Sequence, residues 1–380
     1  MSRSRLAWLA VIAISFGAGA GVGAVVGADR TPSVWRDSES LSAPRSHVNG
    51  VVLANGDVLV FGGLDPAHPG DPVLPRAELV DPSSGAVRIV DGEPVPRIDA
   101  STTTLPYGNV VVAGGSRWIG DDWQQSDVTE VLDPWSRRWS TASPMHYARA
   151  DHGATLLKDG RVLVAGGHQG IRILSSVEIF DPARQTWSLA APLPKPRSQF
   201  SIATLPDGDV LVAGGIEQGG GPSRTSAIYD VAKNAWRPGP ELTAARVLHA
   251  TVPLPNGDVL LIGGQNLAAG SAERYDAVNG RFVYAGSLAR ARLLPQAVSI
   301  GDGRVIVAGG IEPRATSFAP TTSVELWDPR KNAWSLGPDV DEGSAFGALV
   351  VVDRDVWLLA GAGADERALS RVTHLRLPER

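Results

Sequence analysis

The chain has no cysteine, no basic block and none of the common catalytic motifs, and each absence excludes a class of function. Without a Cys among its 380 residues, it has no disulfide, no thiolate metal site and no cysteine nucleophile. Its formal net charge of −5 argues against a nucleic-acid binder, which needs clustered Lys and Arg to neutralise phosphates. A Gly-x-Ser-x-Gly elbow, a phosphate-binding Gly-Lys-Ser/Thr loop, a His-Glu-x-x-His pair and a helix-loop-helix calcium loop are all missing.

What the chain does have is glycine, proline and tryptophan. Its 43 Gly and 28 Pro are typical of many short strands joined by tight turns, because Gly supplies the positive φ that such turns need. Aromatic residues make up only 6% of the chain, yet 11 of them are Trp. This composition predicts an all-β protein and argues against a long helical bundle.

The N-terminus has the pattern of an export segment. Arg3 and Arg5 precede the uncharged run Leu6–Ala28, which as a helix would span about 34 Å, enough for a bilayer core of roughly 30 Å. Only its first half is strongly apolar, and the Gly- and Ala-rich remainder suits a cleaved signal peptide. Both interpretations stay open: residues 1–28 are a signal peptide or an N-terminal membrane anchor, with attachment through residues 6–28. Either one predicts that residues 31–380 are extracytoplasmic, periplasmic or secreted, because the two Arg would stay inside.

Residues 31–380 carry one sequence pattern seven times. A Gly-Gly pair ends an apolar run six times and a Gly-Ala pair ends the seventh, at intervals of 52, 52, 48, 49, 46 and 52 residues. An Asp follows each of the first six pairs, with a Trp, Val or Phe six residues later. This period, with Asn-Gly or Asp-Gly turns before most pairs, indicates four short strands per repeat. The pairs begin at Gly62, Gly114, Gly166, Gly214, Gly263, Gly309 and Gly361.

Two stretches show the pattern in full: DGRVLVAGG with SVEIFDPARQTW within residues 159–187, and DGRVIVAGG with SVELWDPRKNAW within residues 302–334. Because the double Gly, the Glu before the Asp and the downstream Trp recur together, the chain resembles the kelch-repeat proteins over residues 31–380. The resemblance implies a β-propeller, in which each repeat is a four-stranded blade and the blades close into a ring around a central channel.

The spacing also predicts the number of blades and the way the ring closes. Each interior Trp-type position lies 27 residues before the next Gly pair, and Trp35 lies 27 residues before Gly62. The first stretch would therefore supply the outer strand of a blade, whereas the chain ends just after the third strand of the seventh repeat. We expect a seven-bladed ring closed by pairing the strand around Trp35 with the strand around Val372–Leu377; an open or six-bladed ring is the alternative.

An Arg stands ten residues after the Trp-type position in six repeats, with Ser344 in the seventh. A ring of guanidinium groups at the channel mouth would suit carboxylate or phosphate ligands. A residue that recurs in this way also suits a role inside every blade, such as an ion pair with a Glu that recurs in step at Glu78, Glu130, Glu178, Glu273 and Glu325. The candidate ligand-binding residues in this column are Arg45, Arg97, Arg149, Arg197, Arg246 and Arg292.

Residues that differ from blade to blade are better candidates for binding. Polar residues of this kind stand two to four positions beyond the Arg column, near the same mouth. Imidazole and carboxylate groups suit several metal ions, but these residues come from separate blades without tight ligand spacing, so neither a metal nor a cofactor is expected. The candidates are His47, Asp99, Asp151, His152 and His249.

Repeat length varies only between the Gly pair and the Asp, in the loop that joins the second and third strands. These loops open on the same side as the links between blades, and variable loops on a rigid scaffold concentrate binding residues. In the second repeat this loop carries Trp118, Trp123, Asp121 and Asp122. Aromatic rings stack on sugar rings while carboxylates bind hydroxyl groups; the alternative is that either Trp packs onto a neighbouring blade.

These observations predict an exported, monomeric, non-enzymatic propeller that binds a glycan or a protein through the variable-loop face and the channel mouth. The alternative is a carbohydrate-active enzyme, a mutarotase or an enzyme like the kelch-type sialic acid epimerases, with an acid/base pair among Asp99, Asp151, His152, His249 and Glu217. A strongly raised carboxyl pKa in the mouth, next to a His or Arg, would favour the enzyme. Copper-radical galactose oxidases, which also have kelch-type repeats, depend on a Tyr cross-linked to Cys, so their activity is not expected here.

Overall fold

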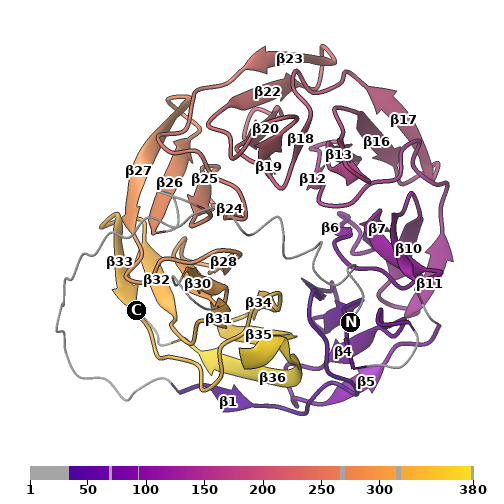
Figure 1. The fold of residues 1–380 in the computed structure, drawn as a ribbon, viewed down its shortest axis with the longest axis vertical. Coiled ribbons are helices and arrows are strands. Elements are labelled where there is room, and N and C mark those ends of the chain that lie inside the picture. Colours follow the sequence, from indigo (N-terminus) through magenta and orange to yellow (C-terminus); the bar gives the residue numbers. More distant parts are fainter. Residues whose placement is uncertain (1–33, 68–70, 93, 266–269, 314–317, 378–380) are drawn as a thin grey trace.

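The computed structural model describes residues 34–67, 71–92, 94–265, 270–313 and 318–377. The predicted export segment, residues 1–28, lies outside these ranges. No helix within them is long and apolar enough to cross a membrane. The described chain forms seven β-sheet blades arranged in a ring (Figure 1). The prediction of an all-β, seven-bladed propeller is therefore confirmed.

Each blade is a four-stranded antiparallel sheet whose first strand lies nearest the centre of the ring and whose last strand lies at the rim (Figure 1). The blades in chain order are β2 (Asn49–Val52), β3 (Val58–Phe61), β4 (Glu78–Val80) and β5 (Val87–Ile89); β6 (Ser101–Thr104), β7 (Val110–Ala113), β10 (Thr129–Asp133) and β11 (Arg138–Thr141); β12 (Gly153–Leu156), β13 (Val162–Ala165), β16 (Val177–Asp181) and β17 (Thr186–Ala190); β19 (Ser201–Thr204), β20 (Val210–Ala213), β22 (Ser226–Asp230) and β23 (Ala235–Pro238). They continue with β24 (Ala250–Pro253), β25 (Val259–Ile262), β26 (Ser271–Asp276) and β27 (Arg281–Ser287); β28 (Gln296–Ser299), β29 (Val305–Ala308), β32 (Glu325–Asp328) and β33 (Ala333–Leu336); and β34 (Ala348–Val352), β35 (Asp355–Ala362), β36 (Ala368–Arg376) and β1 (Arg36–Asp37), with a 3-10 turn η4 (Ala364–Glu366) before β36.

Four two-stranded ribbons stand outside the blades. Three of them form within a loop between the second and third strands of a blade, and the fourth pairs such a loop with the link that enters the blade. This arrangement agrees with the prediction that these loops and the links between blades lie on one side of the ring. The ribbons are β8 (Ser116–Ile119) with β9 (Asp122–Gln125), β14 (His168–Gln169) with β15 (Arg172–Ile173), β18 (Arg197–Ser198) with β21 (Ile216–Glu217), and β30 (Ile311–Pro313) with β31 (Phe318–Pro320).

The core lies between neighbouring blades. The second strand of each four-stranded blade is apolar, and β13 (VLVA) and β29 (VIVA) are buried along their whole length. Their side chains do not alternate between apolar and polar because each face of the strand packs against an adjacent blade. Every Val or Leu side chain buried in this way contributes about 1.5–3 kcal/mol to folding.

Neighbouring blades meet at the Gly-Gly pairs. The N–H of Gly167 donates to the carbonyl oxygen of Arg197 in the next blade at 2.9 Å, and a Cβ on Gly166 would lie only 2.4 Å from that same oxygen. Both glycines have positive φ, so a side chain there would clash and also strain the backbone. The same bond closes the ring, since the N–H of Gly361 donates to the carbonyl oxygen of Arg45 at 2.9 Å.

The ring is closed by the N-terminal strand. β1 pairs with β36, with Arg36 opposite His374. Trp35 is buried, and its Nε1 donates to the carbonyl oxygen of Pro338, at the end of the outer strand of the sixth blade, at 2.8 Å. Trp334 donates in the same way to the outer strand of the fifth blade. Trp35 thus serves as the Trp of the seventh blade, which confirms the predicted closure, and the alternative of an open or six-bladed ring is wrong.

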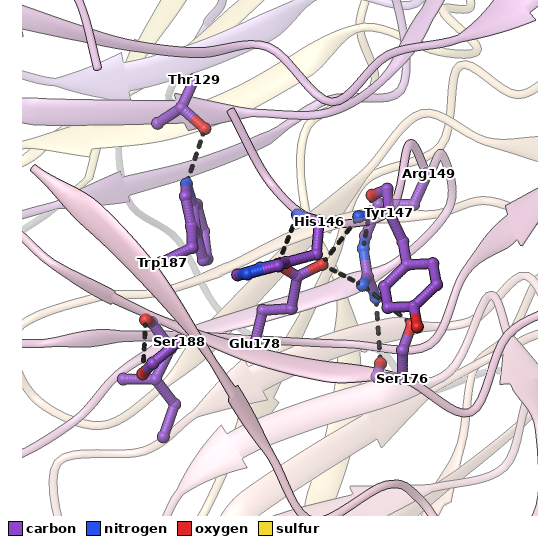
Figure 2. A network of polar contacts seen from close by, with 9 residues as sticks. Thr129, His146, Tyr147, Arg149, Ser176, Glu178, Trp187 and Ser188 are labelled. Carbon is purple, nitrogen blue, oxygen red and sulfur yellow. Dashed lines mark hydrogen bonds and ion pairs between the residues drawn. The ribbon is translucent and has the colours of Figure 1, made fainter. Parts of the chain in front are cut away.

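The Arg column lies inside the blades and not in the channel mouth. Arg149 Nη2 donates to Glu178 Oε1 at 2.7 Å (Figure 2). Its Nη1 donates to the carbonyl oxygen of Gly166 at 2.8 Å. The other carboxylate oxygen of Glu178 accepts the N–H of His146 at 2.7 Å. Each such pair therefore fixes the link that enters a blade to the third strand of that blade.

The interpretation of these arginines as a collar for anionic ligands is therefore corrected. All six are at most 2% exposed, and each forms an ion pair with a carboxylate inside its blade, so a ligand would have to break a buried ion pair to reach them. The pairs and their N–O distances are Arg45–Glu78 at 2.6 Å, Arg97–Glu130 at 2.7 Å, Arg149–Glu178 at 2.7 Å, Arg246–Glu273 at 2.6 Å and Arg292–Glu325 at 2.8 Å, with Arg197–Glu217 at 3.5 Å in the fourth blade.

Candidate functional site

Seven residues, one from each blade, form a ring at the channel mouth, just before the first strand of each blade. We call it the mouth ring. Each member stands two positions after the Arg column or Ser344, and each is a non-glycine residue with φ between 49° and 57°. This left-handed conformation costs energy for residues with a side chain, and such strain concentrates at functional sites. The members are His47, Asp99, Asp151, Gln199, Leu248, Leu294 and Phe346.

One side of the mouth ring is polar. Blades two, three and four contribute Asp99, Asp151 and Gln199, and Gln199 Nε2 donates to Asp151 Oδ2 at 2.9 Å. The N–H of Gln199 also donates to the carbonyl oxygen of Asp151 at 3.0 Å. His168 adds a neighbour from β14, with its Nδ1 at 3.6 Å from Asp151 Oδ2. These contacts hold Asp151, Gln199 and His168 as one connected group.

The other side of the mouth ring is apolar. Blades five, six and seven contribute Leu248, Leu294 and Phe346, and the N–H of Leu294 donates to the carbonyl oxygen of Leu248 at 2.8 Å. The ring of Phe346 stacks on that of His47 with 4.0 Å between centroids. Leu294 and Phe346 also pack against a small buried cluster formed by Leu293, Ile311 and Ala345. The mouth is therefore asymmetric, with acceptor groups facing one half and hydrocarbon the other.

The carboxyl group of Asp99 is the most perturbed acid of the mouth. Burial raises the pKa of Asp99 well above its usual range, and the neighbouring charge of Asp151 raises this pKa further. Its Oδ2 atom has no exposed surface and no hydrogen-bond partner among the described residues. Asp99 therefore keeps its proton to a higher pH than an ordinary aspartate, because ionisation would place two negative charges side by side.

The candidate histidines bridge blades in neutral form. His152 Nε2 lies 2.9 Å from Ser101 Oγ, and His249 Nε2 lies 2.6 Å from Ser201 Oγ, each across a blade boundary. Burial lowers the pKa of both histidines to about 3, with a smaller contribution from the Arg of the same blade. Burial likewise lowers the pKa of His47 to about 4. At neutral pH none of the three has the near-neutral pKa of an efficient general base.

Glu217 does not serve as an acid/base group at neutral pH either. Its carboxylate accepts hydrogen bonds from Ser223, Thr225 and Lys195 and faces Arg197. Burial opposes its ionisation, but these donors and the Arg197 charge outweigh burial and lower the pKa of Glu217 to about 2. Glu217 replaces the missing Glu of the fourth blade as the counter-ion of Arg197.

Three ribbons beside the polar half form one continuous surface, which we call the ribbon wall: β8–β9, β14–β15 and β18–β21. Gln125 Oε1 of β9 accepts the N–H of Gly170, at the turn between β14 and β15, at 2.7 Å. Gln218 Oε1, just after β21, accepts the N–H of Ile173 at 3.1 Å. The ribbons arise from the same three blades that supply the polar members of the mouth ring. Isolated bridges Ile98–Ser116 and Ala150–His168 join their bases to the residues beside that ring.

Trp118 and Trp123 face each other across the β8–β9 ribbon. They are paired in register, half-buried, and in edge-to-face contact with 5.3 Å between ring centroids. Asp121 and Asp122 form the exposed turn of this ribbon, and Asp122 Oδ1 accepts the N–H of Trp123 at 2.8 Å. The sequence prediction that these four residues share one loop on the variable side is consistent with this placement.

Sequence reasoning missed the apolar half of the mouth ring. The search beyond the Arg column looked for polar residues and therefore passed over Leu248, Leu294 and Phe346. Their fixed offset of two residues from the Arg column was the signal that could have found them. Positive φ at a Leu or Phe carries no composition signal of the kind that Gly or Asn provides.

The fold and the mouth define a closed seven-bladed propeller with an asymmetric channel entrance. A kelch motif matches residues 148–194, and together with the seven blades this places the chain in the kelch-repeat propeller family. No curated protein matches the sequence. Many solved structures share the fold; one is a fungal alcohol oxidase of the AA5 family in complex with copper, with 18% sequence identity and a TM-score of 0.73, over 92% of this chain and 77% of that one.

The residues of this chain do not fit a copper centre like the one that this neighbour's description implies. The chain has no Cys, and the described residues contain no group of three or more His, Asp or Glu side chains that could hold a metal ion. Tyr107, Tyr147 and Tyr284 are exposed, and Tyr229 and Tyr275 stand in the third strands of their blades, away from the first-strand ends that form the mouth. The likeness to the oxidase is therefore a likeness of fold.

Proposed function

We propose that this propeller is an exported binding module that recognises a glycan through the ribbon wall and the polar half of the mouth ring. One observation carries the proposal: the hydrogen bonds that the side chains of Gln125 and Gln218 accept join three ribbons into a single surface. This surface lies beside Asp99, Asp151 and Gln199. Rigid, preorganised surfaces of this kind lower the entropy cost of binding. Kelch propellers generally bind protein partners, so a protein ligand is the outcome that remains if no glycan binds.

The chemistry of this surface suits a polyhydroxyl ligand. The polar half of the mouth ring and the Asp121–Asp122 turn supply carboxylate and amide groups for hydroxyls, whereas Trp118 and Trp123 supply partly exposed aromatic surface for the apolar face of a sugar ring. Such a combination of apolar walls and a few polar groups is the usual composition of small-molecule sites.

The proposal is tested by probing an array of glycans and cell-envelope polysaccharides with the purified full chain and with a Trp118→Ala, Trp123→Ala variant. Truncating an aromatic residue at the centre of a binding site costs about 2 kcal/mol, so we expect binding to weaken by at least tenfold. The matched control is Trp135→Ala, which removes a Trp that is 67% exposed in the turn between β10 and β11, on the opposite face of the ring. A glycan signal that Trp135→Ala reduces as much as the double variant would contradict the proposal.

A second candidate function rests on the raised pKa of Asp99. A carboxyl that keeps its proton to a higher pH can donate a proton while a second carboxyl beside it accepts one, which is the requirement for a mutarotase or an epimerase. The neighbour that raises this pKa is Asp151, and no His or Arg contributes. The raised carboxyl pKa that would favour the enzyme is therefore present, but the His or Arg beside it is not among the causes of the shift. Incubating each bound sugar with the protein and following its anomers and epimers by NMR separates this candidate: turnover that Asp99→Asn abolishes supports the enzyme, and unchanged sugar supports binding.

A further inference from the structure

We propose that the mouth ring is a binding site for a cationic group, an ammonium or a guanidinium, which the polar half pairs with Asp99 and Asp151 while the apolar half covers the attached hydrocarbon. This inference rests on the proposed binding function and names the ligand chemistry of the same site. The cation has two sources, a Lys or Arg side chain of a protein partner or an amino sugar of a glycan. The experiment below distinguishes them.

The first argument is an excess of acceptors. Asp99 Oδ2 and Gln199 Oε1 are buried atoms without a hydrogen-bond partner among the described residues. The orientation of the Gln199 amide is fixed, because its Nε2 donates to Asp151 and its Oε1 must then point elsewhere. A buried acceptor without a donor destabilises the folded protein. A ligand that brings several N–H donors would satisfy them, and an ammonium or guanidinium brings three to five.

The second argument is charge. Asp99 and Asp151 repel each other, and the arginines nearest in sequence, Arg97 and Arg149, are committed to Glu130 and Glu178. These two guanidinium groups therefore pair with other carboxylates and not with Asp99 or Asp151. A bound cation would relieve the repulsion and form charge-assisted hydrogen bonds, which are about twice as strong as neutral ones.

The third argument is the apolar half of the mouth ring. Lys and Arg carry several methylene groups before the charged end, and these are buried favourably against apolar surface. Leu248 and Leu294 lie side by side in the ring, and the stacked pair of His47 and Phe346 continues the same side. His47 does not repel the cation at neutral pH, because burial lowers its pKa to about 4.

Binding of a cation must then be linked to the proton of Asp99. The cation favours ionised Asp99, so affinity rises as the pH rises through the pKa of Asp99 in the free protein. The other titratable groups at the pair are His152, which is neutral and bonded to Ser101, and His168 beside Asp151. A His168→Gln variant removes this neighbouring imidazole, so the pH dependence that remains in the variant belongs to the carboxyl pair.

The test is isothermal titration of the full chain with four probes at pH 5 and pH 8. N-acetyl-lysine amide is compared with its Nε-acetylated form, and the deacetylated chitosan trimer with its fully acetylated form, so that acetylation removes the positive charge within each pair. The amino-sugar pair is compared at pH 5, because glucosamine amines are weaker bases than the lysine amine and lose their charge by pH 8. We expect at least one cationic probe to bind tenfold or more tightly than its acetylated partner, with affinity for the lysine probe rising from pH 5 to pH 8 in the wild-type chain and in His168→Gln. Preference for the lysine probe identifies a protein partner as the source, and preference for the amino sugar identifies a glycan.

The variants make the result specific to the mouth. Asp99→Asn with Asp151→Asn should lose the preference for the cation, whereas Asp207→Asn with Asp353→Asn, an equal change of charge at two exposed turns between the first and second strands of their blades, should keep it. Equal binding of cationic and acetylated probes, or equal loss in the two double variants, overturns the inference. If neutral glycans still bind in a Trp118- and Trp123-dependent way, only this inference fails; if no glycan and no probe binds, the proposed function fails with it.

Discussion

At the scale of residues, the mouth ring holds side chains in a state that folding alone would not select. Asp99 combines a left-handed backbone, a buried oxygen without a partner and a charged neighbour. Each of these features costs stability. Residues that cost stability and sit at a channel entrance are candidates for function, because selection for stability would have replaced them.

Replacing Asp99 with Asn should therefore stabilise the protein at neutral and alkaline pH. Folded Asp99 keeps its proton to a higher pH than the unfolded chain does, so the folded state binds more protons between the two pKa values and the free energy of unfolding falls as the pH rises through that interval. Asn does not titrate, so we expect Asp99→Asn to be more stable than the wild type at pH 8 by about 0.5–2 kcal/mol, and the difference to shrink towards pH 5. Urea unfolding at both pH values measures this.

The control for this prediction is Asp122→Asn, at the exposed ribbon turn, which should leave the pH dependence of unfolding unchanged. Parallel pH profiles for the wild type and Asp99→Asn would contradict the description of Asp99 as a buried acid with a raised pKa.

The residue scale also shows where sequence reasoning stops. Arg and Glu recur at matching positions of the repeat, and this recurrence predicted five of the six ion pairs of the Arg column. It could not decide whether the guanidinium groups face the channel or the blade. That depends on how the link between blades returns to the third strand. In the fourth blade Ala227 stands at the Glu position, and only the three-dimensional path of the loop shows that Glu217 takes over.

At the scale of elements, the ribbons behave as one surface because of two glutamine side chains. The existence and position of the variable loops followed from repeat length, since all differences fall between the Gly pair and the Asp. Their pairing into ribbons did not follow, because short polar stretches such as HQGIRI lack the alternation that predicts strands. The hydrogen bond from the N–H of Gly170 to Gln125 Oε1 joins two different blades, and no local sequence pattern predicts it.

We expect Gln125→Ala to loosen the β14–β15 ribbon without unfolding the ring. The variant removes one hydrogen bond near the surface, which is worth about 1 kcal/mol, so amide exchange at Gly170 should become roughly fivefold faster while the melting temperature stays almost unchanged. Hydrogen-exchange NMR measures this, with Gln124→Ala on the exposed side of β9 as the matched control. Exchange at Gly170 that is the same in both variants would show that the Gln125–Gly170 hydrogen bond does not stabilise the β14–β15 ribbon.

At the scale of the whole molecule, the mouth depends on closure. The seven left-handed residues share one circumference only if the first and last blades meet, and the stacking of His47 on Phe346 joins two members of the mouth ring across this seam. Closure was predictable because Trp35 keeps the 27-residue spacing to the first Gly pair. The two-residue length of β1 was not, since strand ends depend on which backbone groups find partners.

The central claim, a closed ring with Arg36 opposite His374, is tested most directly by an Arg36→Cys, His374→Cys double variant. The natural chain has no Cys, and directly opposite residues in antiparallel strands have Cα atoms about 4.5–5.5 Å apart, within disulfide range. The account predicts one intramolecular disulfide in the folded full chain and a melting temperature that falls on reduction. Free thiols, or disulfides only between molecules, in a folded variant would contradict the closed ring and the mouth that depends on it.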